Sequence, residues 1–130
     1  MSIWNGLTAR LALSVAMCAL LIPLASAHHG WGWASDEITE LRGEIVDVRL
    51  GNPHGEVDID VDGAVWTIEV GQPWRNERSG LTEQPLEVGS EFSALGYASN
   101  REGETLLKAV RVTTREGHHA LYPDRIPDTE

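Results

Sequence analysis

Hydrophobic and polar residues alternate along much of the chain. Residues 56–61 (EVDIDV) alternate strictly, and in residues 44–50 the side chains of Val46, Val48 and Leu50 would share one face. A period of two is typical of strands that bury one face against a core. The pattern therefore predicts strands over both segments, with these three apolar side chains turned inward.

Three more strands and one helix follow from the same analysis. Asp62-Gly63 is a two-residue hairpin signal, after which residues 65–70 resume the alternation. Residues 86–97, with a bend at Val88-Gly89, and residues 106–114 are again rich in apolar and β-branched side chains, which favour strands. Between the third and fourth strands, residues 73–80 begin with Pro and end with Gly, which predicts one short helix.

The order of these elements indicates the fold. Three strands, a helix and two strands within about a hundred residues are typical of the OB-fold, a Greek-key barrel that closes on itself. We expect an all-β protein, a small five-stranded OB-like barrel over residues 39–114 with one short helix between strands three and four. In that topology the third and fifth strands run parallel.

The N-terminal segment has the pattern of an export signal. Residues 11–24 are an apolar run too short to span a bilayer comfortably, and Ala25-Ser26-Ala27 supplies a small-x-small cleavage site. We expect residues 1–27 to be a signal peptide, which predicts a periplasmic or secreted protein with no membrane span after cleavage. Residues 28–38 would form an N-terminal His/Trp segment, and residues 115–130 a polar C-terminal tail.

Composition and charge exclude some classes of partner and of metal site. The chain has 130 residues, enough for one domain, and ten Lys and Arg against twenty Asp and Glu give a net charge of −10. Because Arg10 is the only charged residue of the signal, cleavage would leave −11, and a phosphate backbone would be repelled. Nucleic acid is therefore excluded as an expected partner. The single cysteine, Cys18, lies in the signal, so the mature chain would lack disulfides and thiolate metal sites.

Five histidines supply the candidate metal ligands: His28, His29, His54, His118 and His119. Cleavage after Ala27 would make His28 the N-terminus, where its α-amine and imidazole together form a bidentate chelate that suits Cu(II). In an OB-like barrel the turn with His54 and the segment after strand five share one end. Residues 28–37 can span about 33 Å, enough to reach it. We therefore predict an exported protein that binds a transition metal, with copper favoured.

Two other interpretations stay open, and one of them is a histidine that acts as an acid or base without a metal. The His-His start can be a favourable cleavage context, with His54 in a turn and His118-His119 in a solvated tail. The chain would then be a metal-free OB-type binding or adaptor module for a peptide or an oligosaccharide. No nucleophile elbow and no glycine-rich phosphate loop occur in the sequence, so we do not expect an enzyme.

A calcium pattern also occurs, in the wrong context. Asp58, Asp60, Asp62 and Gly63 followed by Glu69 match the ligand spacing of an EF-hand loop. Such a loop lies between two helices, whereas the residues around this segment alternate as strands do. We therefore expect solvated strand carboxylates here, with a weak surface calcium site as the alternative.

Several short motifs carry a family resemblance. They are His28-His29-Gly30, Gly43-Glu44-Ile45-Val46, Asn52-Pro53-His54, Trp66-x-x-Glu69, and Leu86-x-x-Gly89 followed by Gly96. Together they resemble a family of small exported bacterial proteins of unknown function, whose members start His-His and carry Asn-Pro-His. The resemblance covers nearly all of residues 28–114 and implies export and a β-barrel, without an established activity. The chain departs from it in having Gly30-Trp31 where Ser-Phe is commoner, and a second His pair near its end.

Overall fold

The structure is a computed structural model in which residues 30–128 are described. The predicted signal peptide at residues 1–27, and with it His28 and His29, lie outside the described residues. The chain divides into two units, of which Trp33–Glu130 contains all the elements below.

This unit is all-β with one short helix, as the sequence predicts. Its elements are β1 (Ala34–Arg49), β2 (Glu56–Val61), β3 (Ala64–Glu69), α2 (Pro73–Arg78), β4 (Glu91–Ser99), β5 (Leu106–Thr114), β6 (Gly117–Ala120) and a 3-10 helix, η2 (Pro123–Arg125). No helix among residues 30–128 is both long and apolar enough to cross a membrane.

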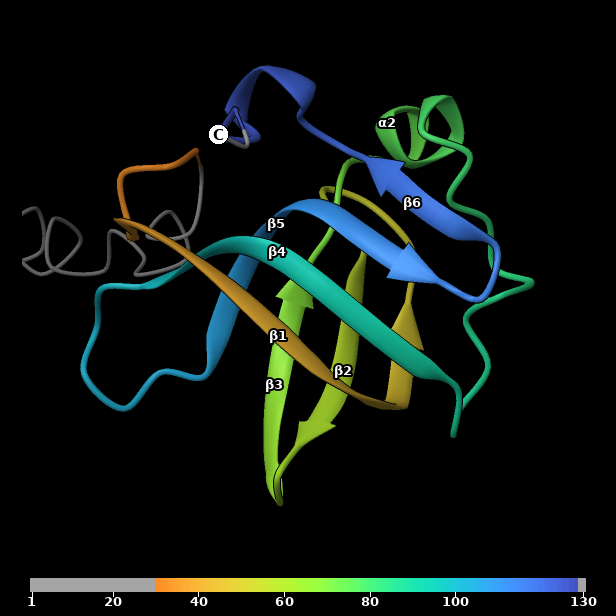
Figure 1. Ribbon diagram of the computed structural model, residues 1–130, viewed down its shortest axis with the longest axis horizontal. Coiled ribbons are helices and arrows are strands. Elements are labelled where there is room, and N and C mark those ends of the chain that lie inside the picture. The colour runs from red at the N-terminus through yellow and green to blue at the C-terminus, as the bar shows by residue number, and fades with distance from the viewer. Residues whose placement is uncertain (1–29, 129–130) are drawn as a thin grey trace, which may run out of the picture. The chain divides into compact units, whose positions relative to one another are not determined.

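The strands form one sheet in the order β3-β2-β1-β4-β5-β6, and β3 also pairs with β5. This last pairing is parallel, from Thr67 opposite Leu106 to Glu69 opposite Lys108, while all other pairs are antiparallel. It joins the first and fifth members of the order, so five strands make a ring (Figure 1). The predicted parallel pairing of the third and fifth strands is therefore confirmed.

The inner face of the ring holds the core. Alternate residues of the strands point inward, as period two requires, and are joined by residues that follow α2 and β6. The buried cluster consists of Ile45, Val57, Ile59, Ile68, Val70, Leu81, Leu86, Phe92, Ala94, Leu107, Ala109, Val112 and Leu121. Trp66 packs against this cluster from β3.

The first strand is longer and more irregular than predicted. It begins at Ala34, inside the expected N-terminal segment, because residues 34–44 pair with β4 along an edge that the polar sequence does not reveal. Its pairing with β2 shifts between Ile45 and Asp47, which places a bulge at Val46. Ile45 consequently enters the core and Val46 is exposed, so the predicted inward position of Val46 is wrong.

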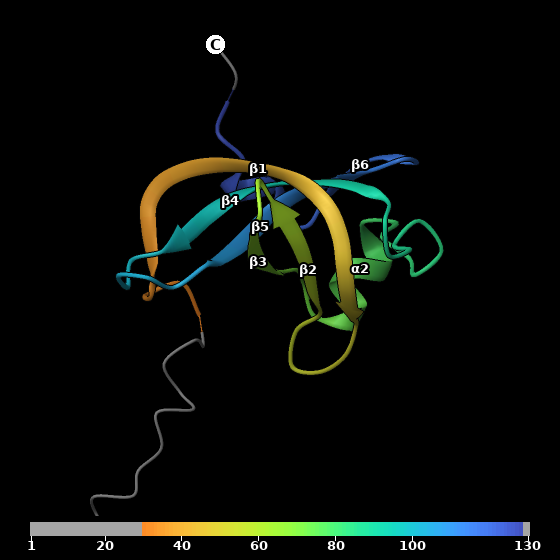
Figure 2. The same cartoon turned by 90° about the horizontal axis from the view of Figure 1, so that it is seen from below.

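β1 is also bent, and it pairs with two strands: with β4 over most of its length and with β2 at its end (Figure 2). At Gly43 an added Cβ would clash with the carbonyl oxygen of Asp60, and at Gly96 with that of Lys108. Both glycines therefore allow neighbouring strands to approach more closely than a side chain would permit.

Two further expectations need correction. Residues 86–90 form a turn instead of the start of the fourth strand, which begins at Glu91. A sixth strand, β6, lies in the expected polar tail and pairs antiparallel with the second half of β5. The predicted count of five strands is therefore wrong by one, because four residues that include two histidines give no alternating apolar signal.

Candidate functional site

A buried ion pair lies where the ring closes. Glu69 and Lys108 are direct partners in the parallel pairing of β3 and β5, and their neighbours Ile68 and Leu107 point into the core. The two charged side chains therefore point to the outer face, yet Glu69 is only 6% and Lys108 only 2% exposed. The Lys108 Nζ atom donates a hydrogen bond of 2.9 Å to Glu69 Oε1. A charge buried this deeply is stable only because its partner is present.

His54 stands beside the same carboxylate. Its Nδ1 atom lies 3.8 Å from Glu69 Oε1, within the range of an ion pair but longer than a hydrogen bond, and its side chain is 15% exposed. Glu69 also contributes to the raised pKa of Tyr122, after the larger effect of burial of the phenol. Imidazole, carboxylate and ammonium thus lie together where the ring closes.

The loop that carries His54, residues 50–55, is held firmly. The Gly55 amide donates to the carbonyl of Gly71 at 3.0 Å, and the Val70 amide donates to the carbonyl of Gly55 at 2.9 Å. Gly71 is fixed in turn by two hydrogen bonds of 2.8 Å with the side chain of Asn76 in α2. The loop, which contains a cis Asn52–Pro53 bond, is therefore tied both to the end of β3 and to the helix.

A pocket of about 300 Å³ opens beside this loop. It is lined by Arg49, Leu50, Gly51, Asn52, Pro53, His54 and Glu56. Arg49 hydrogen-bonds the carboxylates of Asp58, Glu56 and Asp47, and these bonds, that to Asp58 first, raise the pKa of its guanidinium. The same bond to Arg49 lowers the pKa of Asp58, with help from the hydroxyl of Thr67. One guanidinium thus faces three carboxylates, so this side of the pocket keeps a net negative charge.

This arrangement suits binding. A histidine that ligates a metal through one ring nitrogen commonly has a carboxylate near the other, which orients the ring and raises its basicity. Glu69 is placed to act in this way on His54. The pocket beside it also offers polar groups to an organic ligand through Asn52, Arg49 and the backbone of the loop.

The C-terminal histidines are used differently. His119 is 6% exposed, its Nε2 atom is 3.0 Å from the hydroxyl of Thr114, and its Nδ1 atom is 3.2 Å from the carbonyl oxygen of Ser79. His118 is exposed on the other face of β6, with Nδ1 2.8 Å from the hydroxyl of Thr113. The interpretation of this pair as a solvated tail is therefore wrong, because β6 buries one member and hydrogen-bonds both.

The histidines share one end of the ring without forming a cluster. Loop 50–55 is bonded to the start of the α2 segment, and His119 to Ser79 at its end, so both lie near this helix (Figure 1). Among residues 30–128, however, no group of three or more His, Cys, Asp or Glu side chains is arranged to hold a metal ion. His28 and His29 lie outside this range.

The carboxylates of the calcium pattern are also dispersed. Asp58 and Asp60 lie in β2, as the alternation predicts, and Glu69 lies in β3. Asp58 is bonded to Arg49, Asp60 accepts a hydrogen bond from the Gly63 amide in the hairpin turn, and Glu69 is paired with Lys108. The expected strand context is therefore confirmed.

Lys108 was not among the predicted site residues. It lies within a strongly apolar strand (LLKAVRV), where one lysine is easily assigned to solvent. The sequence did contain a signal for this ion pair. The expected parallel pairing of the third and fifth strands brings the end of the third strand, with Glu69, beside the start of the fifth strand, with Lys108.

Comparisons with known proteins give a family without an activity. No curated protein sequence matches the chain. A crystal structure of apo TiaS, a tRNAIle2 agmatidine synthetase, is similar at a TM-score of 0.43 and 15% identity, over 60% of this chain and 18% of that one. The chain thus spans less than a fifth of that protein, and the likeness is too low to indicate a shared function. Residues 16–107, well over half of the chain, match the family of unknown function DUF6152, so the chain belongs to this family.

Proposed function

We propose that this chain is an exported small binding protein, periplasmic or secreted, with an OB-like ring and a ligand site at His54. The pairing order of β1 to β5 and the helix between β3 and β4 support the OB-like assignment. OB-folds bind ligands on the face of their second and third strands and on the loop between the first two. Loop 50–55 is the corresponding loop here.

One observation carries the proposal, namely that His54 is held by a rigid loop beside the buried carboxylate of Glu69. A surface histidine with a purely local role needs no such support. Holding a partly exposed imidazole in one orientation reduces the entropy that ligand binding would otherwise cost.

Cu(II) is the ligand we favour. Cleavage after Ala27 would create an N-terminal His28 with two nitrogen donors, followed directly by His29, in a chain without cysteine after the signal. His54 cannot bind an ion tightly alone, and these are the additional donors that the sequence supplies. His118 and His119 are left out of the proposed ligand set, because both already make hydrogen bonds within the fold.

A metal-free binding module is the second candidate. The pocket of about 300 Å³ beside loop 50–55 is at the lower end of the range for small-molecule sites and has a polar lining. An oligosaccharide or a short peptide segment would meet Asn52, Arg49 and Glu56 there.

The test is a calorimetric titration of Cu(II) into protein purified from the exported fraction, after intact mass has established its first residue. We expect one tight site that is weakened in His54→Ala and in a variant with one extra residue before His28. The extension converts the α-amine into an amide while every imidazole is retained.

His118→Ala is the matched control, because it removes an exposed imidazole that lies outside loop 50–55. It should bind Cu(II) as the wild type does. Equal affinity in wild type and His54→Ala would reject His54 as a ligand. Absence of Cu(II) binding, together with saturable shifts of the loop 50–55 amides on addition of chitotriose or trilysine, would favour the metal-free module.

A further inference from the structure

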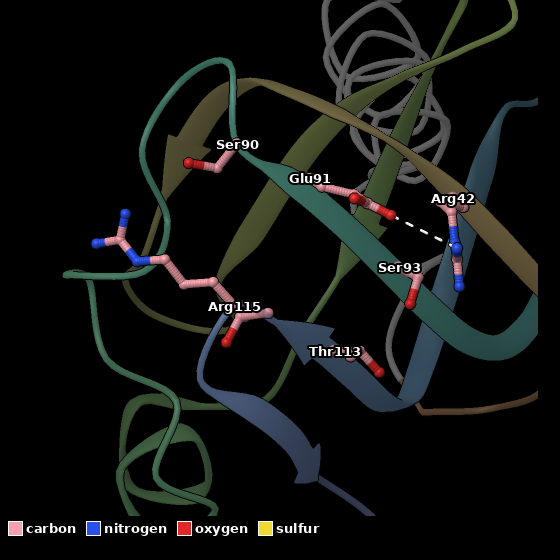
Figure 3. Close-up of a pocket in the computed structure, with 7 residues that line it drawn as sticks. Arg42, Ser90, Glu91, Ser93, Thr113 and Arg115 are labelled. Carbon is pink, nitrogen blue, oxygen red and sulfur yellow. Dashed lines mark ion pairs between the residues drawn. The ribbon is translucent and has the colours of Figure 1, made fainter.

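A second pocket lies on the outer face of the sheet, away from loop 50–55 (Figure 3). Its volume is about 340 Å³, and it is lined by Arg42, Ser90, Glu91, Ser93, Thr113, Thr114 and Arg115. The lining thus includes the hydroxyl groups of three residues, Ser90, Ser93 and Thr113, together with two arginines and one carboxylate, whereas the hydroxyl of Thr114 is bonded to His119. In a chain with a net charge of −10, a lining with more cationic than anionic groups is unusual.

The sheet register builds the floor of this pocket. Arg42 of β1 is opposite Ser93 of β4, Ser93 is opposite Thr113 of β5, and Thr113 is opposite His118 of β6. Directly paired residues project from the same face of a sheet, so these four side chains form one row across four strands. Phe92 and Ala94, the neighbours of Ser93, point into the core. The row therefore lies on the outer face.

Ser93 is the most informative member of the row. It is only 6% exposed, yet within the described part of the chain its hydroxyl makes no side-chain hydrogen bond. Buried polar groups in native proteins almost always have a partner, and one that lacks it calls for an explanation such as a ligand. Figure 3 shows its hydroxyl on the pocket side of β4, next to Thr113.

Thr113 can present a second donor. Its hydroxyl lies 2.8 Å from His118 Nδ1, and when that nitrogen carries the proton the hydroxyl accepts the bond. The hydroxyl proton of Thr113 is then available to an acceptor in the pocket. Ser93 and Thr113 together offer two adjacent O–H donors.

The ion pairs of the two arginines are long and exposed. Arg42 lies 3.5 Å from Glu91 and Arg115 lies 3.5 Å from Glu87, in pairs whose side chains are all more than half exposed. Such surface pairs contribute little free energy, so the Arg42 guanidinium can turn to a bound anion at small cost. Arg115 would also have to give up the 2.9 Å hydrogen bond that it donates to the carbonyl oxygen of Gln84. At physiological ionic strength charges more than about 8 Å away are largely screened, and the pocket lining outweighs the acidic surface.

We propose that this pocket binds a small oxyanion, a phosphate or a sugar carboxylate, through the hydroxyls of Ser93 and Thr113 and the guanidiniums of Arg42 and Arg115. Arginine is suited to both groups because its planar fork donates two parallel hydrogen bonds to their oxygens. The volume leaves space for more than the charged group itself, which favours an anion borne on a small organic molecule. The site is independent of the ligand proposed for His54.

The test follows backbone amide shifts of the exported protein during titration with sodium phosphate and, separately, sodium glucuronate, at an ionic strength held constant with sodium chloride. We expect saturable shifts of the Ser93 and Thr113 amides with one of the two anions, and the anion that saturates identifies the source. If neither titration saturates at these amides, the proposal is wrong.

Matched variants separate a built site from a general charge effect. Ser93→Ala should lower the affinity for the anion about tenfold, as the loss of one hydrogen bond to a charged group implies. Arg42→Gln should lower this affinity at least as much. Arg101→Gln removes the same charge from the turn between β4 and β5 and should leave the affinity unchanged. Equal losses in Arg42→Gln and Arg101→Gln, or none in Ser93→Ala, would overturn the proposal.

Two further measurements test whether a change of anion affinity comes from damage to the fold instead of from loss of a contact to the anion. Without ligand, Ser93→Ala should keep the wild-type unfolding midpoint, because no side-chain hydrogen bond is lost. Glu91→Gln should bind the anion more tightly, since it removes the one carboxylate of the lining. A weaker anion affinity in Glu91→Gln would contradict the proposed role of the pocket charges.

Discussion

Loop 50–55 and strand β6 both carry histidine at the α2 end of the ring, and they use it in opposite ways. In β6, His119 is buried with both ring nitrogens close to hydrogen-bonding groups of the fold, Thr114 and Ser79. In the loop, His54 is partly exposed and faces a carboxylate at 3.8 Å. The difference teaches that the surroundings of an imidazole distinguish a structural histidine such as His119 from His54, for which we propose ligand binding. Residue type and position near a turn do not distinguish the two histidines.

The two regions also differ in what holds them together. The support of His54 depends on the buried charges of Glu69 and Lys108. The support of β6 depends on the hydrogen bonds of its two histidines and on four register pairs with β5. Substitutions that remove a charge should therefore affect the first region much more than the second.

Lys108→Met should have the largest effect. It leaves the Glu69 carboxylate buried without its ammonium partner, which costs about 3–5 kcal/mol of the free energy of unfolding. Urea unfolding measures this loss. The double variant Glu69→Gln/Lys108→Met should recover much of it, because no buried charge remains. A single variant as stable as the wild type would mean that the pair does not hold the ring closure.

His119→Ala tests the other side of the comparison. It removes two hydrogen bonds and a buried ring, and leaves the hydroxyl of Thr114 with only the bond that it accepts from the Glu116 amide, which should cost about 1–3 kcal/mol. His54→Ala should cost less than about 1 kcal/mol, because its side chain is partly exposed and its Nδ1 atom lies 3.8 Å from Glu69 Oε1. Thermal unfolding of both variants ranks them. The reverse order would exchange the roles assigned to the two histidines.

The wall of the His54 pocket should respond to acid. The hydrogen bond from Arg49 lowers the pKa of Asp58 below its ordinary value of 3.8, so the carboxylate stabilises the fold at any pH well above that value. As the pH falls through the lowered pKa, the native carboxylate takes up a proton and this stabilisation is lost.

Asp58→Asn checks that expectation. At pH 7 it should be less stable than the wild type by about 1 kcal/mol, a modest figure because Arg49 is partly exposed to solvent. The difference should shrink in urea unfolding curves measured toward pH 2.5. A difference that stays constant down to that pH would show that the charge of Asp58 contributes nothing.

His118→Ala should have the smallest effect on stability. The side chain is exposed and makes one hydrogen bond, to Thr113, so we expect a change below about 0.5 kcal/mol in the free energy of unfolding. Chemical denaturation of this variant beside His119→Ala compares the two faces of one four-residue strand. Similar losses in both would mean that β6 is held by its register rather than by the burial of His119.

Local pattern was enough to predict some elements. Strict alternation in residues 56–61 and the Asp62-Gly63 turn predict the β2–β3 hairpin, and the Pro at residue 73 predicts the start of α2. These signals depend on neighbours in the sequence. The same holds for His54, whose position in a turn follows from Asn52-Pro53 alone.

Other features depend on pairing between distant residues and could not be predicted. The first half of β1 reads as polar because it pairs with β4 on an outer surface, and β6 is defined only by its partner β5. A bulge in β1 places Ile45 in the core in place of Val46. The alternation of apolar and polar residues does not predict such a shift of register. The burial of Lys108 likewise follows from its register with Glu69, which lies 39 residues earlier.

The closure of the ring has a consequence for the rate of folding. Thr67 pairs with Leu106, and Ala34 pairs with Ser99, so the contacts that complete the ring join residues far apart in the chain. Domains dominated by such contacts fold in milliseconds to seconds, because the entropy of large loops is lost before the contacts stabilise them. Until β3 meets β5, the edges of both strands are open to other chains. If the protein is exported unfolded, this interval is the one in which it would depend most on protection from aggregation.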